Sequence, residues 1–176
     1  MKLTIRKAML SQTRSKSAEE LQNYSTRICS IVEKNKHFLE ANTVLCFWSL
    51  PDEVNTHDLI EKWATKKTIL LPKVIGEKLE LHYFKDKSSM TTGEFGISEP
   101  IGDIFTDYSA IDLCIIPGLA FDNEGSRMGR GKGFYDRFLP QTHCHKMGVC
   151  FPWQIVAKID CAPWDIRMDE VVSFKL

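Results

Sequence analysis

The residues best suited to chemistry in this chain lie in one run, "GLAFDNEGSRMGRGKGFYDRFL", at positions 118–139. Glycine lets backbone N–H groups approach an anion closely, and nearby cations offset the charge of the anion. A helix that begins behind the run adds partial positive charge at its N-terminus. We therefore expect a cradle for a polyphosphate, built from alternating glycines and cations: Arg127, Gly129, Arg130, Gly131, Lys132 and Gly133.

Neither of the two common phosphate-binding motifs matches this run. A Walker loop, G-x-x-x-x-G-K-[ST], would need glycine at Ser126 and a hydroxyl at Gly133. A dinucleotide fingerprint follows its strand directly, whereas Gly129 lies about a dozen residues beyond the preceding predicted strand. Because glycine-rich motifs are weak in isolation, spacing alone leaves open a flexible surface turn with solvated cations.

Acidic and aromatic side chains near this run extend the hypothesis. Asp136 falls in the first turn of the predicted helix, where it could complement the helix dipole or bind Mg²⁺ beside a phosphate. Asp169 could supply a second carboxylate or lie on the surface. Glu53 and Trp48 could bind a flat heterocycle that carries N–H groups, or serve as a turn acid and a core residue.

Short apolar runs predict the strands that position these residues. Buried strands are expected at 43–48, 68–74, 110–117 and 146–151, with a last one near "EVVSFKL". Helices are expected at 2–14, after the Ser17 and Glu20 capping box, at 56–67 and at 132–139. The alternation predicts a mostly parallel sheet covered on both faces. "KLELHYF" at 78–84 predicts a half-exposed hairpin arm, and 85–108 a long irregular connection.

The predicted sheet gathers the candidate residues at one edge. Ligands bind outside the carboxyl ends of strands in open parallel sheets. Four segments should therefore share one rim: 48–55, 72–73, 117–137 and 151–154.

Length, charge and cysteines limit the class of protein. The 176 residues fit a single domain, 1–176. The 23 basic residues are balanced by 23 acidic ones, which disfavours general electrostatic binding to nucleic acid or to an anionic membrane. Six cysteines without a C-x-x-C pair favour a reducing compartment. "HCHK" at 143–146 has no second cluster to complete a metal site, so we expect a solvated loop there.

The sequence predicts neither a membrane span nor a secretory signal. No apolar run approaches the roughly 18 residues that a membrane span needs, and the first 20 residues lack the apolar core of a secretory signal. The chain should be a soluble, cytoplasmic protein. The basic, acid-free stretch at 1–18 also resembles a transit peptide in composition.

The run "PGLAFDNEGSRMGRGKGFYDRFL" resembles the signature of the 5-formyltetrahydrofolate cyclo-ligase family, also called 5,10-methenyltetrahydrofolate synthetases. The similarity extends over essentially the whole chain. It is carried by further segments in order: "KLTIRKAML", "DEVNT", "LPKV", "GISEP", "FPWQIV" and "WDIRMDEVV".

The resemblance implies an α/β/α sandwich in a Rossmann-like arrangement. It also implies ATP- and Mg²⁺-dependent conversion of 5-formyltetrahydrofolate, or of its polyglutamylated forms, to 5,10-methenyltetrahydrofolate, with release of ADP and phosphate. Neither nucleic acid, membrane nor an obligate protein partner is expected. The alternatives are another ATP-dependent ligase or kinase, a non-catalytic folate- or nucleotide-binding module, and a nucleic-acid binder, which the balanced charge disfavours.

The same resemblance implies roles for individual residues. ATP would contact Lys2, Arg6, Arg127, Gly129, Arg130, Gly131, Lys132, Gly133, Phe134 and Tyr135. Lys2 and Arg6 would then belong to the site and not to a transit peptide. The folate would contact Trp48, Glu53, Arg130, Gly131, Lys132, Gly133 and Phe134. Asp136 and Asp169 would hold Mg²⁺, and the catalytic residues would be Arg130, Lys132 and Tyr135. The role of Gln154 stays open.

Overall fold

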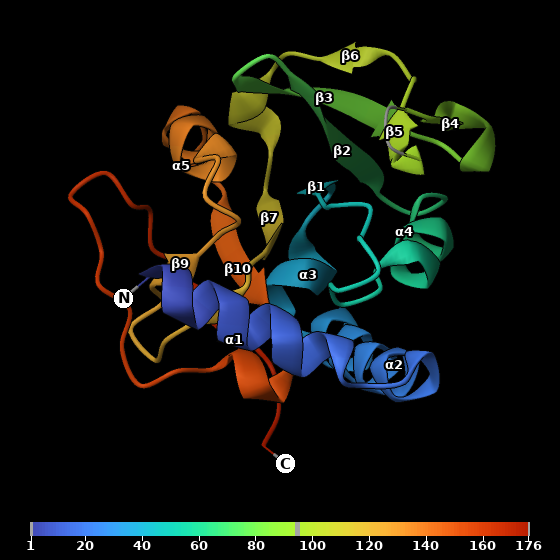
Figure 1. The fold of residues 1–176 in the computed structure, drawn as a ribbon. Coiled ribbons are helices and arrows are strands. Elements are labelled where there is room, and N and C mark those ends of the chain that lie inside the picture. The colour runs from blue at the N-terminus through green and yellow to red at the C-terminus, as the bar shows by residue number, and fades with distance from the viewer. Residues whose placement is uncertain (1, 94–95, 176) are drawn as a thin grey trace.

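A computed structural model of the protein describes residues 2–93 and 96–175 and shows a seven-stranded central sheet (Figure 1). The strand order is β11-β10-β7-β1-β2-β3-β6. Neighbours from β11 to β2 pair in parallel, whereas β3 is antiparallel to both β2 and β6. The strands are β1 (Thr43–Leu45), β2 (Thr68–Ile75), β3 (Lys78–Phe84), β6 (Ile104–Phe105), β7 (Leu113–Pro117), β10 (His145–Val149) and β11 (Glu170–Val172).

Side chains alternate between the two faces of this sheet. Val44 packs into one apolar cluster and its neighbour Leu45 into the other. The Val44 cluster takes in residues of α2 (Ala18–Lys34), α3 (Lys36–Glu40) and α4 (His57–Trp63). The Leu45 cluster takes in Phe138 of α5 (Phe134–Phe138), and α4 and α5 lie on opposite sides of the sheet (Figure 1). The expected three-layer α/β/α class is confirmed.

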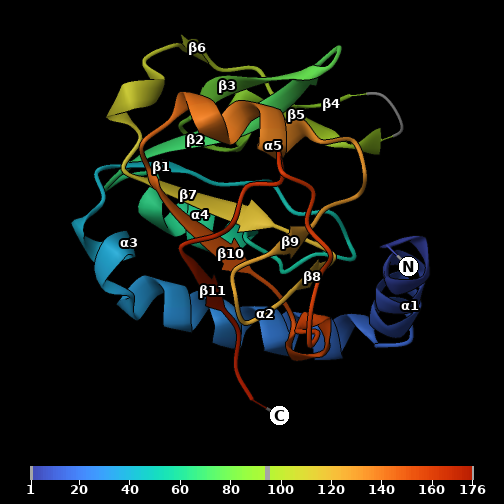
Figure 2. The same ribbon diagram turned by 90° about the vertical axis from the view of Figure 1, so that its left-hand side faces the viewer.

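The N-terminal helix α1 (Lys2–Arg14) packs beside the glycine-rich run. Ile5 and Met9 join a third apolar cluster with Ala120, Met128 and Ile159. Ala120 and Met128 belong to a two-stranded hairpin, β8 (Ala120–Phe121) and β9 (Arg127–Met128), which begins the run (Figure 2). After α1 the chain turns at Ser17 and enters α2. The predicted capping box of Ser17 and Glu20 is formed at this turn.

Several elements differ in extent from their predictions. The hairpin at 78–84 is present, and it extends the central sheet because β3 pairs with β2 along its whole length. The expectation of an irregular connection at 85–108 was wrong in part. That stretch holds the hairpin β4 (Met90–Thr92) and β5 (Ser98–Pro100), the edge strand β6, and the 3-10 turns Lys87–Ser89 and Tyr108–Ala110. Such short strands carry too few residues for their periodicity to be visible.

The predicted helices at 56–67 and 132–139 are also shorter than expected. They form α4 and α5, and α5 continues into a 3-10 turn at Leu139–Gln141. Another 3-10 turn, Pro152–Gln154, follows β10. Among residues 2–93 and 96–175, no helix has both the length and the apolarity needed to cross a bilayer.

Candidate active site

A pocket of about 610 Å³ opens where the strand order reverses. From β1 the chain proceeds outward to β2 and β3, then returns to β7 on the other side of β1. This is the switch point at which open α/β sheets bind ligands. Three of the four predicted rim segments contribute residues to the wall, namely 48–55, 72–73 and 117–137. The fourth, 151–154, contributes none of the wall residues.

The pocket collects all but one of the residues proposed from sequence. Its lining includes Lys2, Arg6, Trp48, Glu53, Arg127, Gly129, Arg130, Gly131, Lys132, Gly133, Phe134, Tyr135 and Asp136. Gly131 and Gly133 have φ angles of 99° and 68°, a region that side-chain-bearing residues enter only with strain. The glycine spacing therefore sets the path of the backbone around the cavity.

Arg127 is fixed on the floor of this pocket. Its side chain is 6% exposed, with Nη1 donating to the Pro117 carbonyl at 3.2 Å and Nη2 lying 3.3 Å from Asp136 Oδ2. The guanidinium carbon lies 5.2 Å from the centroid of the Tyr135 ring. Burial raises the pKa of Tyr135, so its phenol stays protonated at neutral pH and can donate a hydrogen bond.

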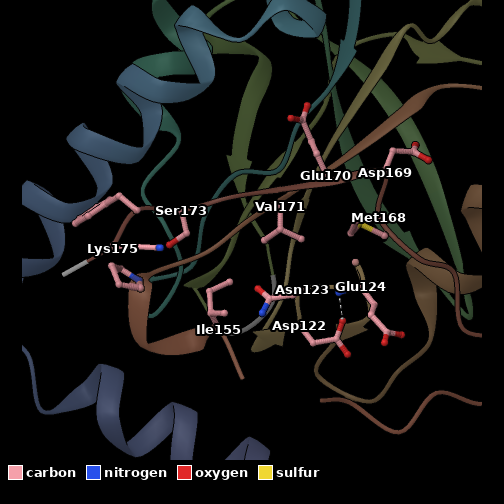
Figure 3. Close-up of a pocket in the computed structure, with 13 residues that line it drawn as sticks. Asp122, Asn123, Glu124, Ile155, Met168, Asp169, Glu170, Val171, Ser173 and Lys175 are labelled. Atoms are coloured by element: carbon pink, nitrogen blue, oxygen red, sulfur yellow. Dashed lines mark hydrogen bonds between the residues drawn. The ribbon is translucent and has the colours of Figure 1, made fainter. Parts of the chain in front are cut away.

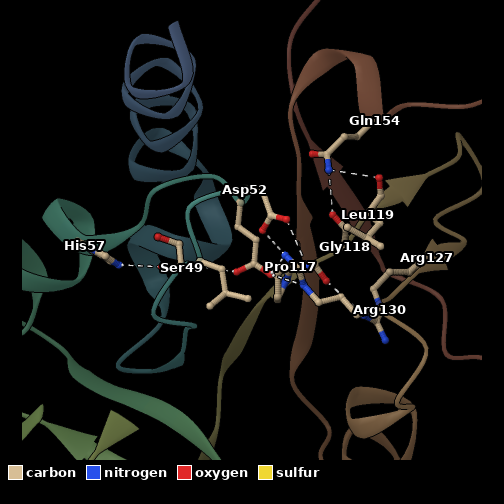
Figure 4. A network of polar contacts seen from close by, with 11 residues as sticks. Ser49, Asp52, His57, Pro117, Gly118, Leu119, Arg127, Arg130 and Gln154 are labelled. Atoms are coloured by element: carbon tan, nitrogen blue, oxygen red, sulfur yellow. Dashed lines mark hydrogen bonds and ion pairs between the residues drawn. The ribbon is translucent and has the colours of Figure 1, made fainter. Parts of the chain in front are cut away.

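Arg130 bridges the glycine-rich run to the segment that follows β1 (Figure 4). Its Nη2 lies 3.1 Å from Glu53 Oε1, and it also donates to Asp52. Burial acts to lower the pKa of Arg130, but the two carboxylates outweigh this effect and raise it. Burial also raises the pKa of Glu53, although bonds from the Leu50 N–H and from Arg130 oppose this shift.

Four further cations line the cavity: Lys2, Arg6, Lys132 and Arg137. Lys2 Nζ lies 2.9 Å from Asp165 Oδ2, and Arg6 Nε donates to the Gly129 carbonyl at 3.0 Å. Lys132 is exposed and has neither an ion pair nor a hydrogen bond within the part of the chain that the structure describes. The contacts of Lys2 and Arg6 show how α1 delivers positive charge to a site more than 100 residues away in sequence.

Asp169 lies away from this group. It lines a separate cavity with Met168 and Glu170 (Figure 3), and its Oδ2 lies 2.9 Å from Lys146 Nζ and accepts from the Lys146 N–H at 2.7 Å. The reason is topological: Asp169 directly precedes β11, at the amino edge of a sheet whose pocket is at the carboxyl edge. The structure therefore does not bring Asp169 and Asp136 together.

Asp165, and not Asp169, lies near Asp136 in the structure. It lines the same pocket as Asp136, and the next residue, Ile166, donates its backbone N–H to Asp136 Oδ1 at 3.2 Å. The neighbouring Trp164 also lines the pocket and is 72% exposed. Trp164, Asp165 and Asp52 were not among the candidates proposed from the sequence. Trp164 and Asp165 nevertheless open the segment "WDIRMDEVV", and Asp52 opens "DEVNT", both of which carry the resemblance.

Gln154 has a role beneath the pocket. It is 3% exposed, and its Nε2 donates to the carbonyls of Gly118 and Leu119 at 3.2 Å each (Figure 4). Its Oε1 accepts from the Phe151 N–H at 2.8 Å. Gln154 thus joins the segment after β10 to the start of the glycine-rich run. The rim segment 151–154 can therefore support the position of the run without lining the cavity.

Comparisons with known proteins agree on one family. The model of the 5-formyltetrahydrofolate cyclo-ligase family matches residues 1–173. A probable 5-formyltetrahydrofolate cyclo-ligase of Schizosaccharomyces pombe is 30% identical, over 95% of this chain and 92% of its own. The Escherichia coli K12 5-formyltetrahydrofolate cyclo-ligase is 35% identical over 76% and 78%. The solution structure of Aquifex aeolicus 5,10-methenyltetrahydrofolate synthetase superimposes with a TM-score of 0.87 at 31% identity, covering 98% of this chain and 89% of that one.

Proposed function

Since the chain belongs to the 5-formyltetrahydrofolate cyclo-ligase family, we propose that its pocket converts 5-formyltetrahydrofolate to 5,10-methenyltetrahydrofolate with ATP and Mg²⁺. ADP and phosphate are the other products. The observation that carries the ATP requirement is the set of cations at the switch-point pocket: Lys2, Arg6, Arg127, Arg130 and Lys132. With Arg137, these cations outnumber the carboxylates of the lining, Glu53, Asp136 and Asp165, and the excess of positive charge favours a polyanionic ligand.

The triphosphate lies against the glycine-rich run in this proposal. Backbone N–H groups between Gly129 and Gly133 approach its oxygens, and Arg127, held in advance by Pro117 and Asp136, needs little reordering to meet it. Lys2 and Arg6 exchange their contacts with Asp165 and the Gly129 carbonyl for phosphate oxygens. Phe134 and Tyr135 close the side of the site next to α5.

Asp136 and Asp165 are the carboxylates suited to Mg²⁺ in this pocket. Mg²⁺ binds oxygen ligands and typically takes one or two carboxylates together with substrate phosphates. Both residues line the pocket, and the backbone N–H of Ile166, the residue after Asp165, donates to Asp136 Oδ1. Asp169 lines another cavity. When bound, the ion neutralises charge on the phosphate oxygens.

The folate occupies the side of the pocket near Trp48 and Glu53. The Trp48 ring stacks on His57 at 3.9 Å between centroids, which fixes one wall. Glu53 presents a carboxylate that can accept hydrogen bonds from a pterin, and Arg130 connects this side to the phosphate side. The two substrates therefore meet at Arg130.

Catalysis follows from position and charge and needs no nucleophile from the protein. The formyl oxygen attacks the γ-phosphorus of ATP as ADP leaves, and the arginines and Lys132 offset charge on the transferred group. N10 then attacks the activated formyl carbon and loses its proton. The phosphorylated oxygen departs as phosphate, which leaves the cyclic methenyl cation. Tyr135, protonated, can donate to an oxygen of the transferred phosphate.

The test of this function follows the methenyl absorbance band of the product. The protein is mixed with 5-formyltetrahydrofolate and Mg²⁺, with and without ATP. We expect the band to grow only with ATP and one ADP to form per methenyl product. Growth without ATP, or ATP binding without turnover beside an active reference cyclo-ligase, would contradict the proposal.

A further inference from the structure

A second cluster of chemically active side chains lies at the edge of the sheet opposite to the pocket. His145 is the first residue of β10 and Glu170 the first of β11, so both stand at amino ends of parallel strands. His37 of α3 lies against them. One ligand-type atom from each of the three residues lies within 4.8 Å of the other two.

The cluster is ordered by contacts of its own. His145 Nε2 lies 3.0 Å from Glu170 Oε1, and the His37 and His145 rings stack with centroids 3.6 Å apart. Asn35 donates its side-chain N–H to both oxygens of Glu170, at 3.2 and 3.0 Å, while its own Oδ1 accepts from the His37 N–H. Asn35 therefore orients the Glu170 carboxylate, as outer contacts do in metal sites, and caps the helix that carries His37.

We propose that His37, His145 and Glu170 bind a divalent transition-metal ion, with Zn²⁺ as the natural occupant. Two imidazoles and one carboxylate suit zinc, whereas Mg²⁺ and Ca²⁺ take oxygen ligands. Zinc bonds of about 2.0–2.1 Å place tetrahedral ligand atoms about 3.3 Å apart, so the cluster has to close slightly. His37, which is exposed on a five-residue helix, can rotate to do so, and water fills the fourth position.

This site changes one conclusion from the sequence. "HCHK" was expected to be a solvated loop without a second cluster, but Cys144 is buried and His145 and Lys146 begin β10. His145 meets its partners at positions 37 and 170, which no local motif reveals. His143 remains exposed, as expected. A bound ion would join α3 to β10 and β11 and so add stability through mass action.

The test titrates Zn²⁺ into the metal-free protein by calorimetry and follows the melting temperature. We expect one saturable site and a rise in melting temperature with Zn²⁺. His37→Ala and Glu170→Gln should each weaken binding at least about tenfold, the lower end of what loss of even an outer contact costs a metal site. His143→Ala is the matched control and should bind as the parent does.

Two controls separate this site from chance binding and from misfolding. Circular dichroism melts without metal establish that each variant is folded, and Asn35→Ser, which keeps a capping oxygen but loses the donor to Glu170, gives a second route to weaker binding. The Co²⁺-loaded protein should show no thiolate charge-transfer band. Absence of saturable binding, equal affinity in all variants, or a thiolate band that assigns the ion to a cysteine such as the exposed Cys161 would overturn the proposal.

Discussion

Lys132 is the residue whose removal tests the phosphate cradle most cleanly. It is exposed and has no ion pair in the described ranges, so Lys132→Ala should change the free energy of unfolding by less than about 0.5 kcal/mol. If Lys132 offsets charge on the transferred phosphate, kcat should fall by about 100-fold or more. Steady-state kinetics with varied ATP measures this, and the exposed Lys158→Ala is the control. Unchanged kinetics in Lys132→Ala would remove it from the site.

The two aspartates that line the pocket make a prediction about metal dependence. Asp136→Asn and Asp165→Asn should each raise the Mg²⁺ concentration needed for half-maximal activity by at least about tenfold. Asp169→Asn should leave the titration unchanged, because Asp169 pairs with Lys146 in another cavity. A larger effect at Asp169 than at Asp165 would return the ion to the pairing first expected from the sequence.

Glu53 predicts the pH dependence of folate binding. Burial raises its pKa above the ordinary glutamate value, and the ionised form is the one that accepts hydrogen bonds from a pterin. As pH falls through that raised pKa, the acceptor becomes neutral and kcat/KM for the folate should decline. In Glu53→Gln this acid limb should disappear at the cost of a lower plateau, whereas the exposed Glu19→Gln should keep it. An identical acid limb in both variants would assign it to another group.

At the scale of elements, Gln154 holds the run in place. Replacing it by Leu leaves the carbonyls of Gly118 and Leu119 without these donors, so the free energy of unfolding should fall by about 1–3 kcal/mol. Activity should fall as well, because Gly118, at the start of the run, itself lines the pocket. Urea denaturation and kinetics measure the two effects, with the exposed Gln12→Leu as control. A Gln154→Leu protein of parental stability would show that Gln154 does not position the run.

How much could be predicted from the sequence is also clearest at this scale. Buried strands and their carboxyl ends followed from local apolar runs, and they placed Trp48, Glu53 and the glycine-rich run on one rim. Contacts between distant segments did not follow. The pairing of β3 with β6, the Asp52 bond to Arg130 and the separation of Asp169 from Asp136 depend on which edge of the sheet each segment meets. Periodicity within a segment carries no such information.

At the scale of the whole molecule, the fold gathers positive charge around one pocket although the formal net charge of the chain is zero. α1 packs on the β8 and β9 hairpin through Ile5 and Met9 and carries Lys2 and Arg6 to the pocket. The sheet order brings the side proposed for the folate, after β1, next to the side proposed for the phosphates, after β7. Under the proposed function, the fold therefore supplies a site for two substrates at a single switch point, with positioning as the main source of rate.

The central claim is that ATP phosphorylates the formyl oxygen, and one isotope experiment tests it most directly. 5-Formyltetrahydrofolate labelled with ¹⁸O in the formyl group is converted by the protein with unlabelled ATP, and the released phosphate is analysed by mass spectrometry. A reaction stopped before completion, with recovered substrate checked for label, controls for exchange with water. We expect one ¹⁸O atom in each phosphate released. Unlabelled phosphate from fully labelled substrate would contradict the account, because the formyl oxygen would then leave without passing through the phosphoryl group.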